Sequence, residues 1–182
     1  MSFINPYIFR EYDIRGNVAE DLPEHIVMKL GKAFGTFVNR AGGREIALSG
    51  DIRLTTPALI NQIKTGILST GVDVINLGIL PTPVIYFSMF HLGVSSAVQI
   101  TGSHNPKHDN GLKIVINDDA ISGLELLSEV ESQAAVIHVE KNYEKINIFP
   151  QYQREINQKF ILNKKIKIVL DAGNGAAGEV AD

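Results

Sequence analysis

Proline and glycine residues divide this chain into short apolar runs that alternate with amphipathic segments. Thr56-Pro57 and Thr82-Pro83 each have the form of a helix start, with threonine as the N-cap and proline at the first helical position. Gly71 and Gly93 close the segments that follow. This alternation of strands and helices favours an α/β fold, with a helix-covered sheet that is mixed but mainly parallel.

Apolar periodicity places the individual elements along the chain. Asp21 and Pro23 open a first helix, whose apolar side chains share one face, and Gly42-Gly43 end it. We predict strands at 45–48, 72–77, 94–100, 112–116 and 166–170, and further helices at 56–70, 82–92, 123–136 and within 138–165.

The last third of the chain differs in character from the first two thirds. Residues 138–165 are polar and weakly periodic, as expected of a connecting helix, and the strand at 166–170 leads into a glycine-rich turn. A strand and a turn without a following helix do not form a domain. We therefore predict one α/β domain at residues 1–150, followed at 151–182 by a linker helix and the first strand of a truncated second α/β domain.

Composition narrows the classes of function. The 182 residues, 45% of them hydrophobic, suffice for one good core, and the absence of cysteine excludes disulfide and thiol chemistry. The net charge is −3 with scattered Lys and Arg, which predicts no nucleic-acid partner. No segment approaches the ~20 apolar residues of a membrane span, and the N-terminus lacks a signal-peptide pattern. We expect a cytoplasmic protein without a membrane partner.

A serine stands at the end of a predicted strand, in the turn Thr101-Gly102-Ser103-His104-Asn105-Pro106. His104 is its neighbour, and Lys113 follows ten residues after Ser103. Catalysis by a serine hydrolase needs an imidazole placed to take the proton from the serine Oγ. Residues that are adjacent in sequence rarely achieve this placement. A phosphoserine instead needs hydrogen-bond donors and cations, which loop N–H groups, Lys113 and Arg15 could supply. The pattern therefore predicts that Ser103 carries a phosphoryl group.

Two further segments contain arginine next to aspartate. In residues 9–16, Arg15 could form part of a phosphate clamp, or pair with Asp13 in a surface turn. Asp51 and Arg53 follow a predicted strand, where Arg53 is a candidate for supporting the serine turn.

The glycines of residues 173–178 fit the pattern G-x-G-x-x-G after an apolar run. Dinucleotide-binding folds use this pattern to bring backbone close to a pyrophosphate, but it also fits a tight turn between a strand and a helix. The acidic residue expected about 20 positions further on would lie beyond residue 182. The start of a dinucleotide-binding enzyme and a catalytically silent α/β binding module therefore stay open as alternatives.

Four motifs occur together in a characteristic order: residues 12–16 (Tyr-Asp-Ile-Arg-Gly), 101–106 (Thr-Gly-Ser-His-Asn-Pro), 110–114 (Asn-Gly-Leu-Lys-Ile) and 171–178. In this order the chain resembles the front part of the four-domain α-D-phosphohexomutase family, in its phosphomannomutase/phosphoglucomutase branch. The resemblance implies the phosphoglucomutase first-domain fold. Phosphoglucosamine mutase is the alternative branch, which usually carries a Gly-Thr-Asp-Gly-Ile-Arg-Gly type segment and alanine in place of Gly102.

The resemblance also implies a reaction. Ser103 would donate its phosphoryl group to a hexose 1- or 6-phosphate and take back the other phosphate from a hexose 1,6-bisphosphate intermediate, which also acts as the activator. The substrates implied are glucose or mannose phosphates, and the net reaction is isomerisation. The full-length enzyme is expected to be a monomer, and this chain alone is expected to be inactive.

Individual site residues follow from the same resemblance. In the family, Mg²⁺ bridges the phosphoserine and an Asp-x-Asp-x-Asp triplet, and this chain has no such triplet. Ser103 is therefore its one expected contribution to the metal. Residues 49–53 also depart from the Gly-Arg-Asp-Gly-Arg form common in relatives. The first arginine of that form is missing here, so any contact it makes in relatives is not expected in this chain. The second arginine is present as Arg53. The implied catalytic residues are Ser103, His104, Arg15 and Lys113, and the implied substrate-binding residues are Tyr12 and Asn105.

Overall fold

The structure, a computed structural model, describes residues 4–121, 123–131 and 142–180. Its centre is a seven-stranded sheet with the order β1-β5-β4-β2-β3-β7, and β6 pairs with β5. The strands are β1 (Asp13–Asn17), β2 (Glu45–Gly50), β3 (Asp73–Ile79), β4 (Ala97–Ile100), β5 (Asp109–Ile116), β6 (Asp119–Ala120) and β7 (Tyr143–Lys145). The helices are α1 (Glu24–Arg40), α2 (Thr56–Leu68), α3 (Thr82–Leu92), α4 (Gly123–Glu131) and α5 (Phe149–Lys159), with 3₁₀ turns η1 (Pro6–Ile8) and η2 (Ala176–Val180).

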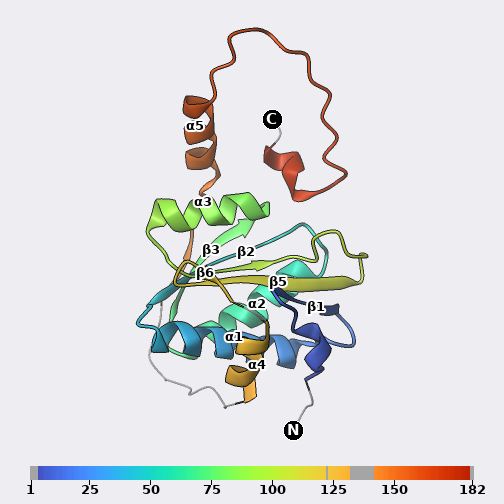
Figure 1. Cartoon of the computed structure of the whole chain (residues 1–182), viewed down its shortest axis with the longest axis vertical. Coiled ribbons are helices and arrows are strands. Elements are labelled where there is room, and N and C mark those ends of the chain that lie inside the picture. Colours follow the sequence, from blue (N-terminus) through green and yellow to red (C-terminus); the bar gives the residue numbers. More distant parts are fainter. Residues whose placement is uncertain (1–3, 122, 132–141, 181–182) are drawn as a thin grey trace.

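Helices cover both faces of the sheet, as predicted. Helices α1, α2 and α4 lie on one face and α3 lies on the other (Figure 1). The larger core lies under α1 and α2 around the fully buried Phe34, and a smaller core lies under α3. The central strands β2 and β4 are buried along their whole length except at Glu45, because helices exclude water from both of their faces.

The sheet is mixed, also as predicted. Among the described strands, β2 runs parallel to β3 and β4, and β3 to β7, whereas β5 is antiparallel to β1, β4 and β6. Gly50 pairs with Ile100 at the carboxyl ends of β2 and β4. The segments that follow these two strands therefore meet at one edge of the sheet, which is where ligand sites form in such folds.

Strand β1 was not foreseen. Residues 9–16 were expected to form a turn or a phosphate clamp, and residues 13–17 instead pair with β5, with Asp13 opposite Lys113 and Arg15 opposite Gly111. A five-residue edge strand with two charges has a weak sequence signal, because it is short and its charged residues interrupt the apolar pattern of a strand.

The helix starts also differ from the expectation. Helix α1 begins at Glu24 after Pro23, while Asp21 accepts a hydrogen bond from the Asn17 backbone N–H at 2.9 Å. Thr56 was predicted as an N-cap, but it is the first residue of α2 and its hydroxyl donates to Asp51. Thr82 is likewise the first residue of α3. Asp21 and Thr56 instead bind partners that the local cap pattern does not include, since Asp21 also accepts from Asn5.

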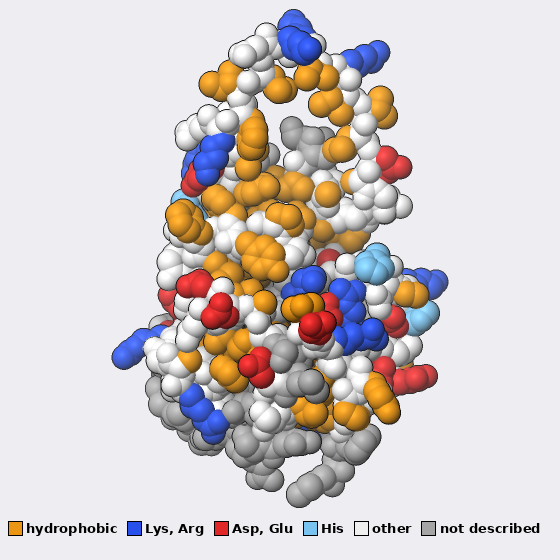
Figure 2. All heavy atoms as spheres, in the orientation of Figure 1, with side chains coloured by type: hydrophobic (Ala, Val, Ile, Leu, Met, Phe, Trp, Pro, Cys, Tyr) orange, Lys and Arg blue, Asp and Glu red, His pale blue; other side chains and the backbone are white. Residues whose placement is uncertain are grey.

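The C-terminal part departs most from the expectation. Residues 166–170 do not form the predicted strand, and they leave the body of the protein as an extended segment (Figure 1). Val169 is 94% exposed, and Figure 2 shows apolar side chains along this segment. A strand needs a neighbour for its backbone hydrogen bonds, and none lies beside this segment in the described part of the chain.

Other boundaries shift by a few residues. The predicted strand 94–100 begins at Ala97, and the predicted strand 112–116 begins earlier, at Asp109. The helix expected within 138–165 is α5, and the short strand β7 before it was not predicted. Helix α4 covers the first part of the helix expected at 123–136, and residues 132–136 of that prediction lie outside the described residues.

Helices α1 and α2 cross at glycine. A Cβ added to Gly66 would lie 2.3 Å from the Met28 carbonyl oxygen. Because the obstructing atoms are helix backbone, Gly66→Ala should separate the helices and lower the unfolding free energy by about 2 kcal/mol, despite the better helix propensity of alanine. Urea titration of the chain measures this, with exposed Thr65→Ala in the same helix as the control, expected within about 0.5 kcal/mol of wild type.

Candidate active site

Ser103 occupies the loop between β4 and β5; we call this loop, together with the first residue of β5, the serine loop (residues 101–109). Its backbone is left-handed, with φ of 53°, a conformation that costs a side-chain-bearing residue about 1–2 kcal/mol. The Thr101 hydroxyl accepts the Ser103 N–H at 2.9 Å, and the Asn105 N–H donates to the Gly102 carbonyl at 2.9 Å. These bonds hold a strained turn that leaves the Ser103 side chain exposed.

His104 lies beside the serine hydroxyl. Its Nδ1 is 3.3 Å from Ser103 Oγ, which is hydrogen-bond distance, and both side chains are exposed. A neutral imidazole can accept or donate a proton at this nitrogen according to its tautomer. The pair predicted from sequence is therefore together in the structure.

Arg15 links β1 to the serine loop. Its Nη1 donates to the Gly102 carbonyl and to Asn105 Oδ1, both at 3.0 Å. Its Nε and Nη2 lie 2.8 and 2.7 Å from Asp13 Oδ2. Asn105, predicted to bind substrate, uses its side chain within the loop: Oδ1 accepts from Arg15 and Nδ2 donates to Asp109 at 3.1 Å. Arg15 therefore fixes the loop.

Lys113 joins this group through Asp13. Its Nζ lies 3.6 Å from Asp13 Oδ2, the same carboxylate oxygen that binds Arg15. Asp13 is a member of the site that sequence reasoning considered only as a surface partner of Arg15. Its position could have been found from strand periodicity, because residues two apart on a strand share a face and Asp13 and Arg15 do so on β1.

Tyr12, the other predicted substrate-binding residue, lies just before β1 with 67% of its surface exposed. A hydrogen bond with Glu11, and the negative charge of that neighbour, raise the pKa of the Tyr12 phenol above its usual value. The Tyr12 phenol therefore stays neutral at neutral pH.

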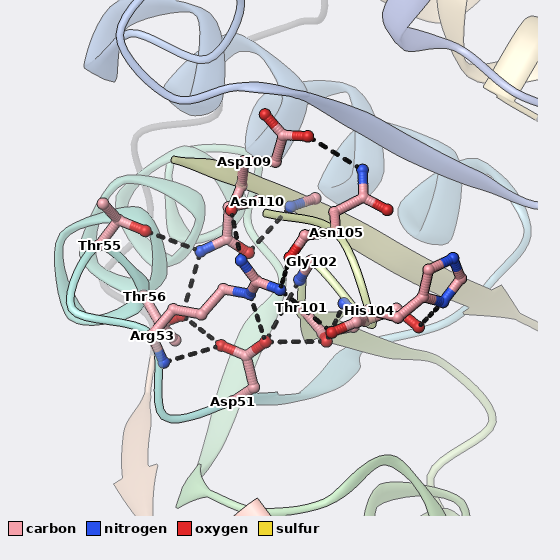
Figure 3. Close-up of polar contacts among 12 residues, drawn as sticks. Asp51, Arg53, Thr55, Thr56, Thr101, Gly102, His104, Asn105, Asp109 and Asn110 are labelled. Atoms are coloured by element: carbon pink, nitrogen blue, oxygen red, sulfur yellow. Dashed lines mark hydrogen bonds and ion pairs between the residues drawn. The ribbon is translucent and has the colours of Figure 1, made fainter. Parts of the chain in front are cut away.

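Asp51 and Arg53, which follow β2, form a second set of contacts with the serine loop, as Figure 3 shows. Arg53 donates to backbone carbonyls of the serine loop, and Asp51 accepts from Thr101 and from the Gly102 N–H. Asn110 Nδ2 donates to Thr55 and Thr56 at 3.0 and 3.1 Å and so ties the start of β5 to helix α2. Thr101 and Asn110 belong to sequence motifs, but their contacts could not be predicted, because their partners lie 50 or more positions away.

Ser103 lines an open cavity of about 920 Å³. One wall is made by residues 51–55 and the serine loop, and another by residues 173–177, the glycine-rich turn. Lysine, arginine and histidine side chains gather on the part of the surface next to it (Figure 2). A cavity of this size accommodates a small ligand, and its basic margin favours an anionic one.

The described residues do not fit a magnesium site of their own. No group of three or more His, Asp or Glu side chains among residues 4–121, 123–131 and 142–180 is arranged to hold a metal ion. Of the carboxylates at the serine loop, Asp13 and Asp51 each pair with an arginine, and Asp109 accepts from Asn105. The Mg²⁺ implied by the resemblance remains a prediction.

An exposed serine beside imidazole, guanidinium and ammonium groups, at the edge of a helix-covered mixed sheet, is an arrangement suited to phosphate esters. The family model for phosphoglucomutase/phosphomannomutase, alpha/beta/alpha domain I, matches residues 6–146. The chain belongs to this phosphoglucomutase/phosphomannomutase family.

Individual relatives agree with this membership. The chain is 35% identical to a phosphomannomutase of Vibrio cholerae over 185 residues, which cover 96% of this chain and 40% of the relative. It is 37% identical to a phosphomannomutase/phosphoglucomutase of Pseudomonas putida, with 96% and 38% covered. A crystal structure of a phosphoglucomutase/phosphomannomutase family protein from Burkholderia thailandensis matches with a TM-score of 0.91 at 34% identity, over 98% of this chain and 41% of that one.

These comparisons bear on the alternatives. The chain spans about 40% of the length of the curated relatives it matches. Residues 166–170, which precede the glycine pattern at 173–178, do not form the strand that a dinucleotide site places there. None of the described helices combines the length and apolar character needed to cross a bilayer. The division of the chain at residue 150 stays a prediction.

The left-handed backbone at Ser103 yields a stability test. Glycine adopts this conformation without the Cβ penalty, so Ser103→Gly should be more stable than Ser103→Ala by about 1 kcal/mol, although both lack the hydroxyl. Ser69, with φ of −65°, is the control, and there alanine should be the more stable replacement. Thermal unfolding of the glycine and alanine variants at both sites measures these differences. If glycine and alanine ranked in the same order of stability at Ser103 and at Ser69, the strained turn would be contradicted.

Proposed function

We propose that this chain supplies the phosphoryl-carrying serine of a hexose phosphate mutase. Ser103 donates its phosphoryl group to the free hydroxyl of a hexose 1- or 6-phosphate, and regains the other phosphoryl group from the hexose 1,6-bisphosphate. The observation that carries the proposal is the exposed Ser103 at 3.3 Å from His104 Nδ1, in a turn braced by Arg15 and facing an open cavity. The names of the relatives, phosphomannomutase and phosphoglucomutase, supply the substrate class.

Each transfer exchanges one P–O bond for another. When Ser103 gives up its phosphoryl group, the P–Oγ bond breaks, a bond from phosphorus to the sugar oxygen forms, and the proton of the sugar hydroxyl must leave. The serine oxygen must then gain a proton. His104 is placed to supply it and to remove it again in the reverse transfer, because its Nδ1 is within reach of Oγ.

The cations offset the charge that the phosphoryl group brings. A phosphoserine carries about −1.5 to −2 charges near neutral pH. Arg15 and Lys113 together contribute two positive charges, of which Asp13 compensates one. The surplus is available to the phosphate. Groups beyond this chain's share of the relatives are needed to align the sugar, so we expect the chain alone to show no mutase turnover.

Phosphorylation of Ser103 is the direct test. Incubation of the complete gene product with glucose 1,6-bisphosphate should raise its intact mass by one phosphoryl group, and peptide mapping should locate that group on Ser103. Ser103→Ala should abolish the uptake, because no other serine among the described residues combines a strained exposed turn with an adjacent imidazole.

Ser69→Ala is the matched control for this measurement, since Ser69 lies at the end of α2 with its hydroxyl bonded to the Gly66 carbonyl. It should take up phosphate like wild type. Phosphate found on another residue while Ser103 stays unmodified would refute the carrier assignment.

The charge of Lys113 provides a second test. Lys113→Met keeps the length of the side chain but removes the ammonium, so kcat/KM for hexose phosphates should fall at least ~10-fold, equivalent to ~1.4 kcal/mol. The thermal midpoint should hardly change, because Asp13 keeps its partner Arg15. Lys159→Met on α5, whose side chain is 69% exposed, is the control and should retain full activity. A large stability loss with normal catalysis would assign Lys113 a structural role.

A further inference from the structure

The guanidinium of Arg53 donates hydrogen bonds to four backbone carbonyl groups of the serine loop. Its Nη2 donates to the carbonyls of Ser103 at 3.0 Å and Asn105 at 2.7 Å. Its Nη1 donates to those of Pro106 at 2.6 Å and Asp109 at 3.0 Å. The loop is therefore folded around a single cation, and one of its four points of attachment is the carbonyl of the strained Ser103.

Asp51 holds Arg53 in place. Its Oδ2 accepts from Arg53 Nε at 3.2 Å and its Oδ1 from the Arg53 backbone N–H at 3.1 Å. The same carboxylate accepts from Thr56 at 2.7 Å and from Thr101 at 2.9 Å. The Asp51 and Arg53 side chains are only 16% and 14% exposed, so their charges interact in a poorly solvated environment.

Fixing the carbonyls also fixes the amide N–H groups of the loop. The described chain contains no cis peptide bond, and in a trans peptide the N–H points opposite to the C=O. The Ser103 and Pro106 carbonyls face Arg53, so the N–H groups of His104 and Lys107 are directed away from it. The negative ends of these peptide dipoles face the guanidinium, and their positive ends face outward, which favours an anion there.

We propose that Arg53, held by Asp51, is a positioning residue for phosphoryl transfer: it sets the backbone of Ser103 and aims the outward N–H groups of the serine loop at the phosphoryl group. Arg53 acts on the transfer step through the backbone of the serine loop. The inference rests on the proposed function of Ser103 as the carrier. It goes further by assigning the orientation of the carrier to a residue whose guanidinium is turned to the loop backbone.

The geometry requires a guanidinium rather than any cation. Four carbonyls and a carboxylate are reached by donors spread over a rigid plane, and the ammonium of a lysine has three donors at one point. Gly102 packs against this plane, since a Cβ there would lie 2.5 Å from Arg53 Cζ. Lysine should therefore replace the charge without restoring the orientation of the loop.

The test compares Arg53→Lys, Arg53→Met and Asp51→Asn in the complete gene product. Arg53→Met should lower kcat for hexose phosphates by about 100-fold and leave KM within about 3-fold, because misplacement of the reacting groups affects the transfer step rather than capture of the sugar. Arg53→Lys should recover less than a tenth of the lost rate. Asp51→Asn, which keeps the shape but not the charge, should fall between wild type and Arg53→Met.

Chemical rescue gives a readout that a merely structural role would not move. Guanidinium ion at about 20 mM should raise kcat of Arg53→Ala at least ~10-fold, whereas methylammonium at the same concentration should not, because only the planar ion can bridge the loop carbonyls. The fraction of folded enzyme is determined in parallel from near-ultraviolet circular dichroism, so that kcat refers to folded protein. Arg44→Met, an exposed arginine just before β2, is the matched control and should behave as wild type.

The outcomes separate the two proposals. One outcome would refute the role of Arg53 and leave the function of Ser103 intact. In that outcome the wild-type protein takes up the phosphoryl group and turns over substrate, and Arg53→Met has the same kcat. Equal rescue by guanidinium and methylammonium would also refute it, because charge alone would then suffice. A wild-type protein without phosphoryl uptake or turnover would instead refute the proposed function itself, and this inference with it.

Discussion

The carboxylate of Asp51 joins the segment between β2 and α2 to the serine loop, which lies 50 residues further along the chain. It binds the side chain of Arg53 just after β2, the first residue of α2 and the start of the serine loop after β4. Loss of one partner from a poorly solvated ion pair typically costs about 3–5 kcal/mol, because the other charge is left uncompensated. The loop that bears Ser103 therefore depends on a charge pair outside it, and the conformation of Ser103 is set at the edge of the sheet.

Two copies of the tripeptide Asp-Ile-Arg contact this loop, one on β1 at residues 13–15 and one just after β2 at residues 51–53. In each copy the aspartate pairs with the arginine two residues later, and the arginine donates to the loop backbone. The isoleucines between them differ, since Ile14 is fully buried and Ile52 is 46% exposed. The two copies are thus similar in their ion pair. The aspartate neutralises the charge of the arginine, and the guanidinium keeps further N–H groups that donate to carbonyl oxygens of the loop.

Local patterns predicted the elements that have strong local causes. Helices α1 and α2 follow their apolar periodicity, and the glycines after them end them, as the left-handed Gly42 and Gly71 show. The strand expected at 166–170 failed because a strand is stabilised by its neighbours rather than by its own sequence. Strands β1 and β7 were missed for the same reason, since each is short and lies at an edge of the sheet.

The sequence by itself determined the class of fold, and it placed Ser103 next to His104 at the end of a strand. The Ser103-His104 pair needed only adjacency, and the four ordered motifs identified the family, because chemistry at that level depends on residue type and order. Tertiary structure alone decided how the site is built: that Asp13 serves both Arg15 and Lys113, and that Arg53 turns four loop carbonyls toward itself. Those contacts follow from the pairing of β1 with β5 and of β2 with β4. Strand pairing is fixed by the packing of the whole sheet and its helices, and no local stretch of residues contains it.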